Sequence, residues 1–135
     1  MKIHNKATNK KKKYVKISIA LFFVFICIII IVIVGNLKPE NLVVKDIDIN
    51  NVKNGIYTGS ADNKLVKATV SVEVNNGKIQ NINILKHDHL LGKPAEKITT
   101  SIIKQQSLDV DAITSATYSS NTIRKAVENA LRKGE

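Results

Sequence analysis

The chain has 135 residues, which allows one domain of ordinary size and excludes a large multidomain enzyme. Its formal net charge of +10 would suit a nucleic-acid-binding protein, but seven lysines lie in residues 1–36, which contain no acidic residue. Residues 37–135 carry fourteen basic and eleven acidic side chains and no basic stripe interleaved with aromatic residues. We therefore expect no nucleic acid among the partners.

The N-terminal part combines a lysine-rich arm with one long apolar run. Residues 1–16 hold the seven lysines, and residues 17–34 are apolar except for one serine. A helix of this length can cross the ~30 Å core of a bilayer. The run is longer than the apolar region of a signal peptide, and no small-residue cleavage site follows it. We predict a cytoplasmic arm (1–16) and a transmembrane helix (17–34).

The same lysines predict the orientation of this helix. Positive residues beside a span stay on the cytoplasmic side of the membrane. We therefore expect a single-pass protein of the plasma membrane, with a cytoplasmic N-terminus and an extracytoplasmic C-terminal part. The one cysteine, Cys27, lies inside the span, so neither a disulfide nor a cysteine metal site supports the exported part.

The exported part begins with polar sequence and continues with strand patterns. Residues 35–53 contain Pro39, and we interpret them as a stalk or linker. A short strand between glycines is expected over residues 55–60. Residues 64–74 then alternate apolar and polar side chains, which is typical of a strand with one buried face.

An antiparallel hairpin is expected next. Asn75-Asn76-Gly77 supplies the residues that a tight hairpin turn with positive φ requires. Residues 78–85 form the partner strand, with Ile82 and Ile84 on one face. A loop follows over residues 87–93.

Two amphipathic helices complete the domain. Pro94 suits the first turn of a helix that runs to about Gln106. The last helix is expected to start near Ser119 or Ser120, both good N-caps, and to end near Gly134. Its apolar stripe is Ile123, Ala126, Val127, Ala130 and Leu131. The fold class is therefore α+β, with a small antiparallel sheet packed with two helices in an extracytoplasmic domain over residues 54–135.

Residues 109–120 stand out because they place five Ser and Thr side chains between an acidic pair and a helix start. The first N–H groups of a helix lack internal partners, and the helix dipole adds positive charge there. A phosphate group is well placed at such a point. The residues alone fit an ordinary capping loop as well.

The stretch Asp111-Ala112-Ile113-Thr114-Ser115-Ala116-Thr117 resembles the flavinylation motif of the FMN-binding domain family. That family includes flavin-bearing subunits of sodium-pumping NADH:quinone oxidoreductase and of Rnf complexes, and many small membrane-anchored proteins. Its motif more commonly has Gly where this chain has Ser115. The strand Gly55-Ile56-Tyr57-Thr58-Gly59 is similar to the opening strand of the family, and the resemblance extends over roughly residues 54–132.

The resemblance implies that Thr117 carries FMN through a phosphoester bond. It also implies a separate flavin transferase: the Thr117 hydroxyl attacks the pyrophosphate of FAD, FMN is attached, and AMP leaves. Asp111, Thr114 and Ser115 would be recognised by that enzyme or would position the loop. The expected cofactor-binding residues are Thr117, Asp111, Thr114, Ser115, Ala116, Tyr118, Ser119, Ser120 and Tyr57. The two tyrosines are candidates to pack against the isoalloxazine ring, with ordinary core or surface packing as the alternative.

The resemblance thus implies a membrane-anchored extracytoplasmic electron carrier that works between membrane or extracellular redox proteins and an acceptor. No second catalytic constellation is visible, so an electron-transfer component is favoured over a stand-alone oxidoreductase. One alternative is a flavin-dependent extracytoplasmic reductase. Another is a non-redox ligand-binding or sensory module in which Thr117 is unmodified.

A second polar element, His87-Asp88-His89, stands where the family often has a His-x-Glu-Thr-like sequence. Two histidines at i and i+2 of an extended segment can point the same way and bind a metal. Since the sequence shows no third ligand, we expect a solvated loop and no metal site.

Overall fold

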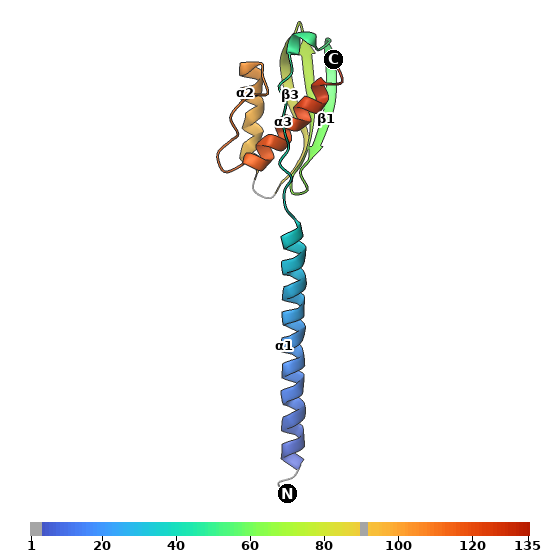
Figure 1. Cartoon of the computed structure of the whole chain (residues 1–135), viewed down its shortest axis with the longest axis vertical. Helices are drawn as coiled ribbons and strands as arrows, with labels where there is room; N and C mark the ends of the chain where they lie inside the picture. The colour runs from blue at the N-terminus through green and yellow to red at the C-terminus, as the bar shows by residue number, and fades with distance from the viewer. Residues whose placement is uncertain (1–3, 90–91) are drawn as a thin grey trace. The chain divides into compact units, whose positions relative to one another are not determined.

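The computed structural model describes residues 4–89 and 92–135, and the chain divides into two compact units, residues 1–38 and 39–135. The first unit is α1 (His4–Asn36), which contains the expected apolar run (Figure 1). Its part Lys11–Asn36 contains an 18-residue window with a mean hydropathy of 3.6 and is long and apolar enough to cross a membrane. A signal sequence near an N-terminus meets the same criterion, so α1 is a candidate span.

The second unit contains an antiparallel sheet in the order β1-β2-β3 (Figure 1). The strands are β1 (Gly55–Asp62), β2 (Lys67–Asn75) and β3 (Lys78–Asp88). In the central strand the alternating side chains Ala68, Val70, Val72 and Val74 are buried, as their period of two predicts. The expected α+β class is confirmed.

The hairpin between β2 and β3 closes through the predicted turn. Asn76 and Gly77 both have positive φ, 52° and 66°, which a two-residue turn between twisted strands requires. The strand pairing then shifts between Glu73 and Val74, which leaves Gln80 as an extra residue in β3. Because of this bulge, Ile79 and Ile82 both face the core although they are three residues apart.

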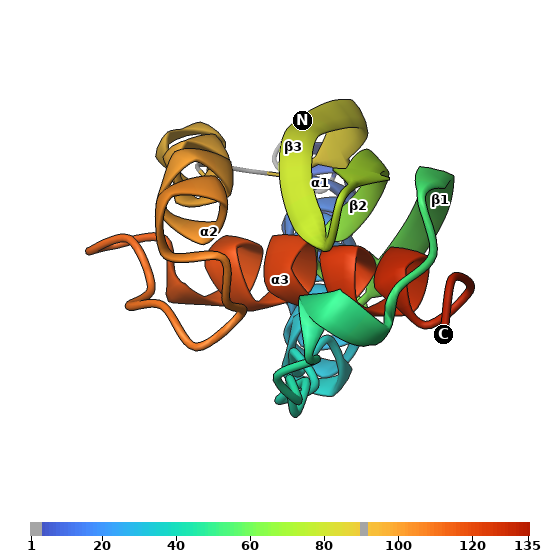
Figure 2. The same ribbon diagram turned by 90° about the horizontal axis from the view of Figure 1, so that it is seen from above.

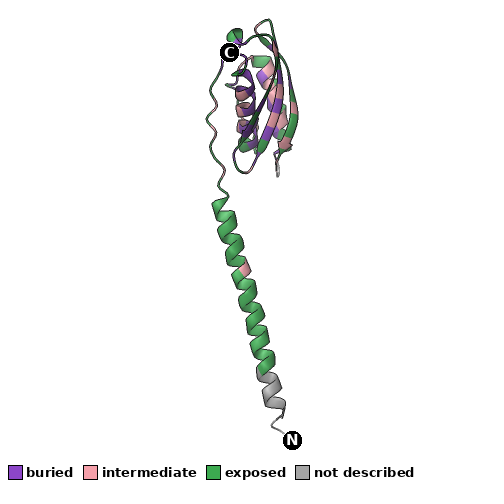
Figure 3. Cartoon of the chain, turned by 90° about the vertical axis from the view of Figure 1, so that its right-hand side faces the viewer, coloured by how far each residue is buried: buried purple, intermediate pink, exposed green. Residues whose placement is uncertain are grey.

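Two helical segments cover one face of the sheet (Figure 2). The helix expected from Pro94 consists of a 3-10 turn, η2 (Lys93–Lys97), and α2 (Ile98–Gln105), which lies beside β3. The longer α3 (Thr117–Leu131) crosses β1 and β2. Buried side chains line the space between sheet and helices, whereas the outer face of the sheet is largely exposed (Figure 3).

The residues between α1 and β1 pack against the domain. We expected a stalk over residues 35–53, but from residue 39 onward the chain belongs to the compact unit, and Ile47, Ile49 and Val52 are buried. A short 3-10 turn, η1 (Ile49–Asn51), lies within this segment. Ile47, Ile49 and Val52 belong to the same hydrophobic core as the strands and helices.

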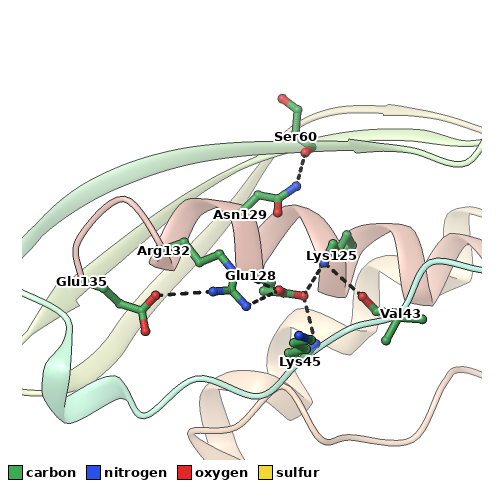
Figure 4. A network of polar contacts seen from close by, with 8 residues as sticks. All are labelled: Val43, Lys45, Ser60, Lys125, Glu128, Asn129, Arg132 and Glu135. Atoms are coloured by element: carbon green, nitrogen blue, oxygen red, sulfur yellow. Dashed lines mark hydrogen bonds and ion pairs between the residues drawn. The ribbon is translucent and has the colours of Figure 1, made fainter.

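A buried carboxylate ties this N-terminal segment to α3 (Figure 4). The Glu128 side chain is 1% exposed and accepts hydrogen bonds from the Lys45 N–H (3.0 Å), the Lys125 Nζ (2.9 Å) and the Arg132 Nε (2.9 Å). Lys125 also donates to the Val43 carbonyl at 3.0 Å. Burial raises the pKa of Glu128, but these donors outweigh it and hold the pKa below its ordinary value.

Candidate functional site

The hydroxyl-rich segment leads directly into the N-terminus of α3. The helix begins at Thr117, since the Ser120 N–H donates to the Ala116 carbonyl at 2.9 Å and closes the first turn. Our expectation that Ser119 or Ser120 caps the helix is therefore wrong. Both are buried inside the first turn, and the Ser120 hydroxyl accepts a hydrogen bond from the Ile113 N–H (3.0 Å) instead.

A tight turn precedes the helix. The Ala116 N–H donates to the Ile113 carbonyl at 2.9 Å, and Ser115, the third residue of this turn, has φ 64°. Left-handed backbone at this position favours glycine, because a Cβ atom is crowded there. This conformation explains why the flavinylation motif more commonly has Gly where this chain has Ser115.

The N-terminus of α3 is open. Its N-cap residue, Ala116, makes no side-chain capping bond. The N–H groups of the first turn have no intrahelical partner, and the helix dipole places partial positive charge beside them. Thr117 is exposed at this point, so its hydroxyl is accessible next to donors that suit a phosphate group.

A hollow of ≈ 170 Å³ lies beside Thr117. Leu65 and Val66 come from the turn between β1 and β2 and supply apolar surface. Residues 115–119 line the hollow on the α3 side, and Gly92 completes it. The arrangement offers an apolar surface next to an anion-accepting helix end.

Two residues that shape this hollow were not singled out from the sequence. The buried Asn63 Oδ1 accepts the N–H groups of Leu65 (3.1 Å) and Val66 (2.7 Å), which fixes the turn. A Cβ on Gly92 would lie 1.9 Å from the Ser119 Oγ, so glycine allows the loop to approach α3. The signals were the Asp-Asn pair between two strand patterns and the isolated glycine.

The remaining predicted site residues lie in different places. Asp111 and Thr114 are exposed on the loop before the helix, and Tyr118 is 49% exposed beside the hollow. Tyr57 lies at the other end of α3, where its ring is close enough that a Cβ on Gly134 would be 2.6 Å from it. Since α3 has 15 residues and is about 22 Å long, the structure does not bring Tyr57 to Thr117.

The loop before the site is held from two sides. Asp46 accepts hydrogen bonds from the Leu108 N–H (2.8 Å) and the Ser107 hydroxyl (2.7 Å), and the Arg124 Nε donates to the Leu108 carbonyl (2.8 Å). Burial raises the pKa of Asp46. The hydrogen bonds that Asp46 accepts from Leu108, Ser107 and the Ile47 N–H, together with the charge of Arg124, outweigh burial and hold this pKa below its ordinary value.

The second polar element does not form the solvated loop that we expected. His87 is the penultimate residue of β3, and its side chain is 2% exposed. Its Nδ1 lies 3.2 Å from Glu96 Oε1 in η2, and the rings of His87 and His89 have centroids 4.4 Å apart. Glu96 is therefore a third potential metal ligand beside the two histidines, which the sequence alone did not show.

Comparisons with known proteins agree with the motif. A family model described as an FMN-binding domain matches residues 64–132, which include the whole turn and Thr117. A protein of Treponema pallidum (strain Nichols), described as an uncharacterized protein, is 31% identical over 85 residues, or 61% of this chain and 24% of that protein. The chain thus spans about a quarter of the length of that relative. No solved structure matches the chain significantly.

Proposed function

Since this chain belongs to the FMN-binding domain family, we propose that it is a membrane-anchored flavoprotein with FMN attached to Thr117 through a phosphoester bond. In this proposal it relays electrons between membrane redox partners and an acceptor. The observation that carries the proposal is the exposed Thr117 hydroxyl at the first residue of α3, beside uncapped N–H groups and an apolar hollow.

The proposed attachment needs a second protein. The motif contains no His or Lys that could take the proton of the Thr117 hydroxyl, and a Thr hydroxyl is a weak nucleophile without a base or metal. A flavin transferase would supply this activation and hold FAD. The bond from Thr117 Oγ to the FMN phosphorus forms, the pyrophosphate bond breaks, AMP leaves, and the hydroxyl proton passes to the transferase.

The residues around Thr117 fit the group that would be attached. The phosphoester keeps one negative charge, which the N–H groups and the dipole of the first turn of α3 stabilise. Leu65 and Val66 offer apolar surface, and Tyr118 offers an aromatic ring beside it. The flavin supplies the redox chemistry when it is bound, and the protein supplies its position and electrostatic environment.

The proposed location follows from α1 and the lysines that precede its apolar part. With the arm in the cytoplasm, residues 39–135 lie outside the cell. A covalent bond there prevents loss of the cofactor by dilution. The helix holds the domain near redox proteins of the same membrane, which are the proposed electron donors.

Co-expression of the full chain with a flavin transferase tests the attachment. We expect a protein band that remains fluorescent after denaturing electrophoresis, is lost in Thr117→Val and persists in Thr117→Ser. Thr100→Val is the matched control, because Thr100 is an exposed threonine in α2, outside the flavinylation motif, and this variant should stay fluorescent. An unlabelled wild-type chain beside a transferase that labels another substrate, or a labelled Thr117→Val variant, would sink the proposal.

The relay is tested separately from attachment. The flavinylated chain is reduced chemically in its native membranes or in detergent, and its reoxidation is followed by flavin absorbance. A relay is reoxidised rapidly only when a partner protein is present. Rapid turnover of a small-molecule acceptor by the purified chain alone would instead support a reductase.

A further inference from the structure

His87, His89 and Glu96 form a cluster outside the proposed attachment site. One potential ligand atom from each side chain lies within 4.8 Å of the others. The two histidines come from the end of β3 and the residue after it, and Glu96 comes from η2. In the described residues of the chain, the cluster joins two imidazoles and one carboxylate at the edge of the core.

A bulge in β3 turns the histidines toward this carboxylate. The pairing of β2 and β3 shifts between Thr69 and Val70, which leaves Leu85 as an extra, exposed residue. Beyond the shift, His87 pairs with the buried Ala68 and therefore points to the inner face, as does His89 two residues later. Bulges re-aim side chains in this way, so the local backbone is built to bring the two rings together.

Two ring nitrogens of the cluster have no hydrogen-bond partner among the residues that the structure describes. An ionised carboxylate only accepts hydrogen bonds, so the His87 Nδ1, 3.2 Å from Glu96, must donate. The His87 Nε2 is then left buried without a partner, and so is the His89 Nδ1. Burial of a polar atom without a partner is unfavourable, so two such atoms in one cluster point to a ligand that would satisfy them.

We propose that His87, His89 and Glu96 bind a divalent transition-metal ion of the zinc class. Two imidazoles and a carboxylate are a donor set that such ions accept, whereas calcium and magnesium prefer sites made of oxygen atoms. The ion would bind one nitrogen of each ring and an oxygen of Glu96, whose side chain would turn from its hydrogen bond with His87 Nδ1 to the ion. The contact from Glu96 supplies negative charge beside the His87 ring.

The present geometry is near that of a bound site. Ligand atoms around a tetrahedral zinc ion are about 3.3 Å apart, given metal–ligand bonds of about 2.0–2.2 Å. The observed spread of up to 4.8 Å closes by small rotations, and Glu96 has room to move because its side chain is 37% exposed. The buried His87 ring is the fixed member of the set.

The proposed metal site adjoins the hollow but is independent of flavin attachment. A Cβ on Gly92 would contact both the His89 Cβ (3.4 Å) and the Ser119 Oγ (1.9 Å), so His89 and the first turn of α3 flank the same glycine. No residue is shared between the cluster and the flavinylation motif. Metal binding can therefore be measured with or without FMN.

The test is a titration of the full chain, purified in detergent through a tag without histidine and freed of metal with a chelator. Zinc is titrated by calorimetry and Co²⁺ by its visible absorbance, which reports on the coordinating atoms. We expect about one ion per chain in the wild type and a higher melting temperature with zinc. His89→Gln and Glu96→Gln should each weaken binding at least about tenfold.

Two controls separate this result from other causes. Asp88→Asn removes an exposed carboxylate between the two histidines that pairs with Lys86, and it should leave the affinity unchanged. Thr117→Val should also leave it unchanged, whatever its effect on flavin. The metal site would be overturned if the wild type showed no saturable binding. It would also be overturned if His89→Gln and Glu96→Gln bound the ion as tightly as the wild type does. His87→Gln is a supplementary variant because its buried side chain also contributes to folding.

Discussion

The two ends of α3 differ in how tightly they are packed. Near the C-terminal end the helix contacts the sheet backbone directly, because Gly59 has no side chain and a Cβ there would lie 2.1 Å from the Ala126 carbonyl oxygen. At the N-terminal end Thr117 and Tyr118 are exposed and no side chain caps the helix. A helix that is packed along most of its length can thus present an open end at a defined position, which the proposed attachment of FMN requires.

The packed end should be the most sensitive to substitution. In Gly59→Ala the new Cβ would meet backbone atoms of α3, the Ala126 carbonyl and the Ala130 N–H (2.4 Å), which cannot rotate away. We expect a loss of about 3 kcal/mol or more, measured as a large fall in the melting temperature of the full chain in detergent.

Gly35→Ala is the matched control, since nothing lies within 4 Å of a Cβ at that position. It should leave the melting temperature of the domain unchanged. If both substitutions are tolerated equally, the close contact between β1 and α3 does not exist in solution.

The buried Glu128 should have the next largest effect. Glu128→Gln removes the charge that accepts hydrogen bonds from Lys125, Arg132 and the Lys45 N–H, and we expect a loss of about 2–3 kcal/mol at neutral pH. Glu135→Gln, at an exposed carboxylate that also faces Arg132, should cost less than about 0.5 kcal/mol.

The stability difference between the wild type and Glu128→Gln should also depend on pH. Because the pKa of Glu128 lies below its ordinary value of 4.5, the stabilisation from its charge is fully present above about pH 4.5 and is lost as the pH falls through the lowered pKa. The stability difference between wild type and Glu128→Gln should therefore shrink on acidification. Hydrogen exchange of α3 amides at neutral and acidic pH measures it, and a constant difference would contradict this role of Glu128.

Substitution at the open end of α3 should have a smaller effect on stability, and this effect should be stabilising. Ser115→Gly relieves the left-handed backbone (φ 64°) and should stabilise the domain by up to about 1 kcal/mol. Because the motif accepts glycine here, FMN attachment should persist. Ser107→Gly, in the same loop but with a hydroxyl bonded to Asp46, should destabilise instead. A fall in melting temperature for Ser115→Gly would contradict the left-handed backbone conformation at Ser115.

Sequence reasoning succeeded where local chemistry and packing agree. The valine alternation of β2, the Asn76-Gly77 turn and the apolar stripe of α3 each have one conformation that buries their side chains. The FMN-binding domain family was also recognisable, because the residue types of its motif are specific, and the family model over residues 64–132 confirms it. These features could be predicted from the sequence.

Other features depend on contacts between distant residues and could not be predicted. The bulge at Leu85 has no glycine to mark it, so the inward direction of His87 was missed. The start of α3 was placed too late, because the Ser120 hydroxyl binds the Ile113 N–H and does not cap the helix. Residues 39–53 pack through contacts with distant residues, such as the hydrogen bond from the Lys45 N–H to Glu128.

The intact mass of the full chain, co-expressed with a flavin transferase, is the most direct test of the central claim. We expect an increase equal to the mass of FMN less one water, and fragmentation should place this increase on Thr117. The Thr117→Val chain should have its unmodified mass. An unmodified wild-type chain beside an active transferase, or an increase that maps to another residue, would contradict the claim that the open end of α3 carries the flavin.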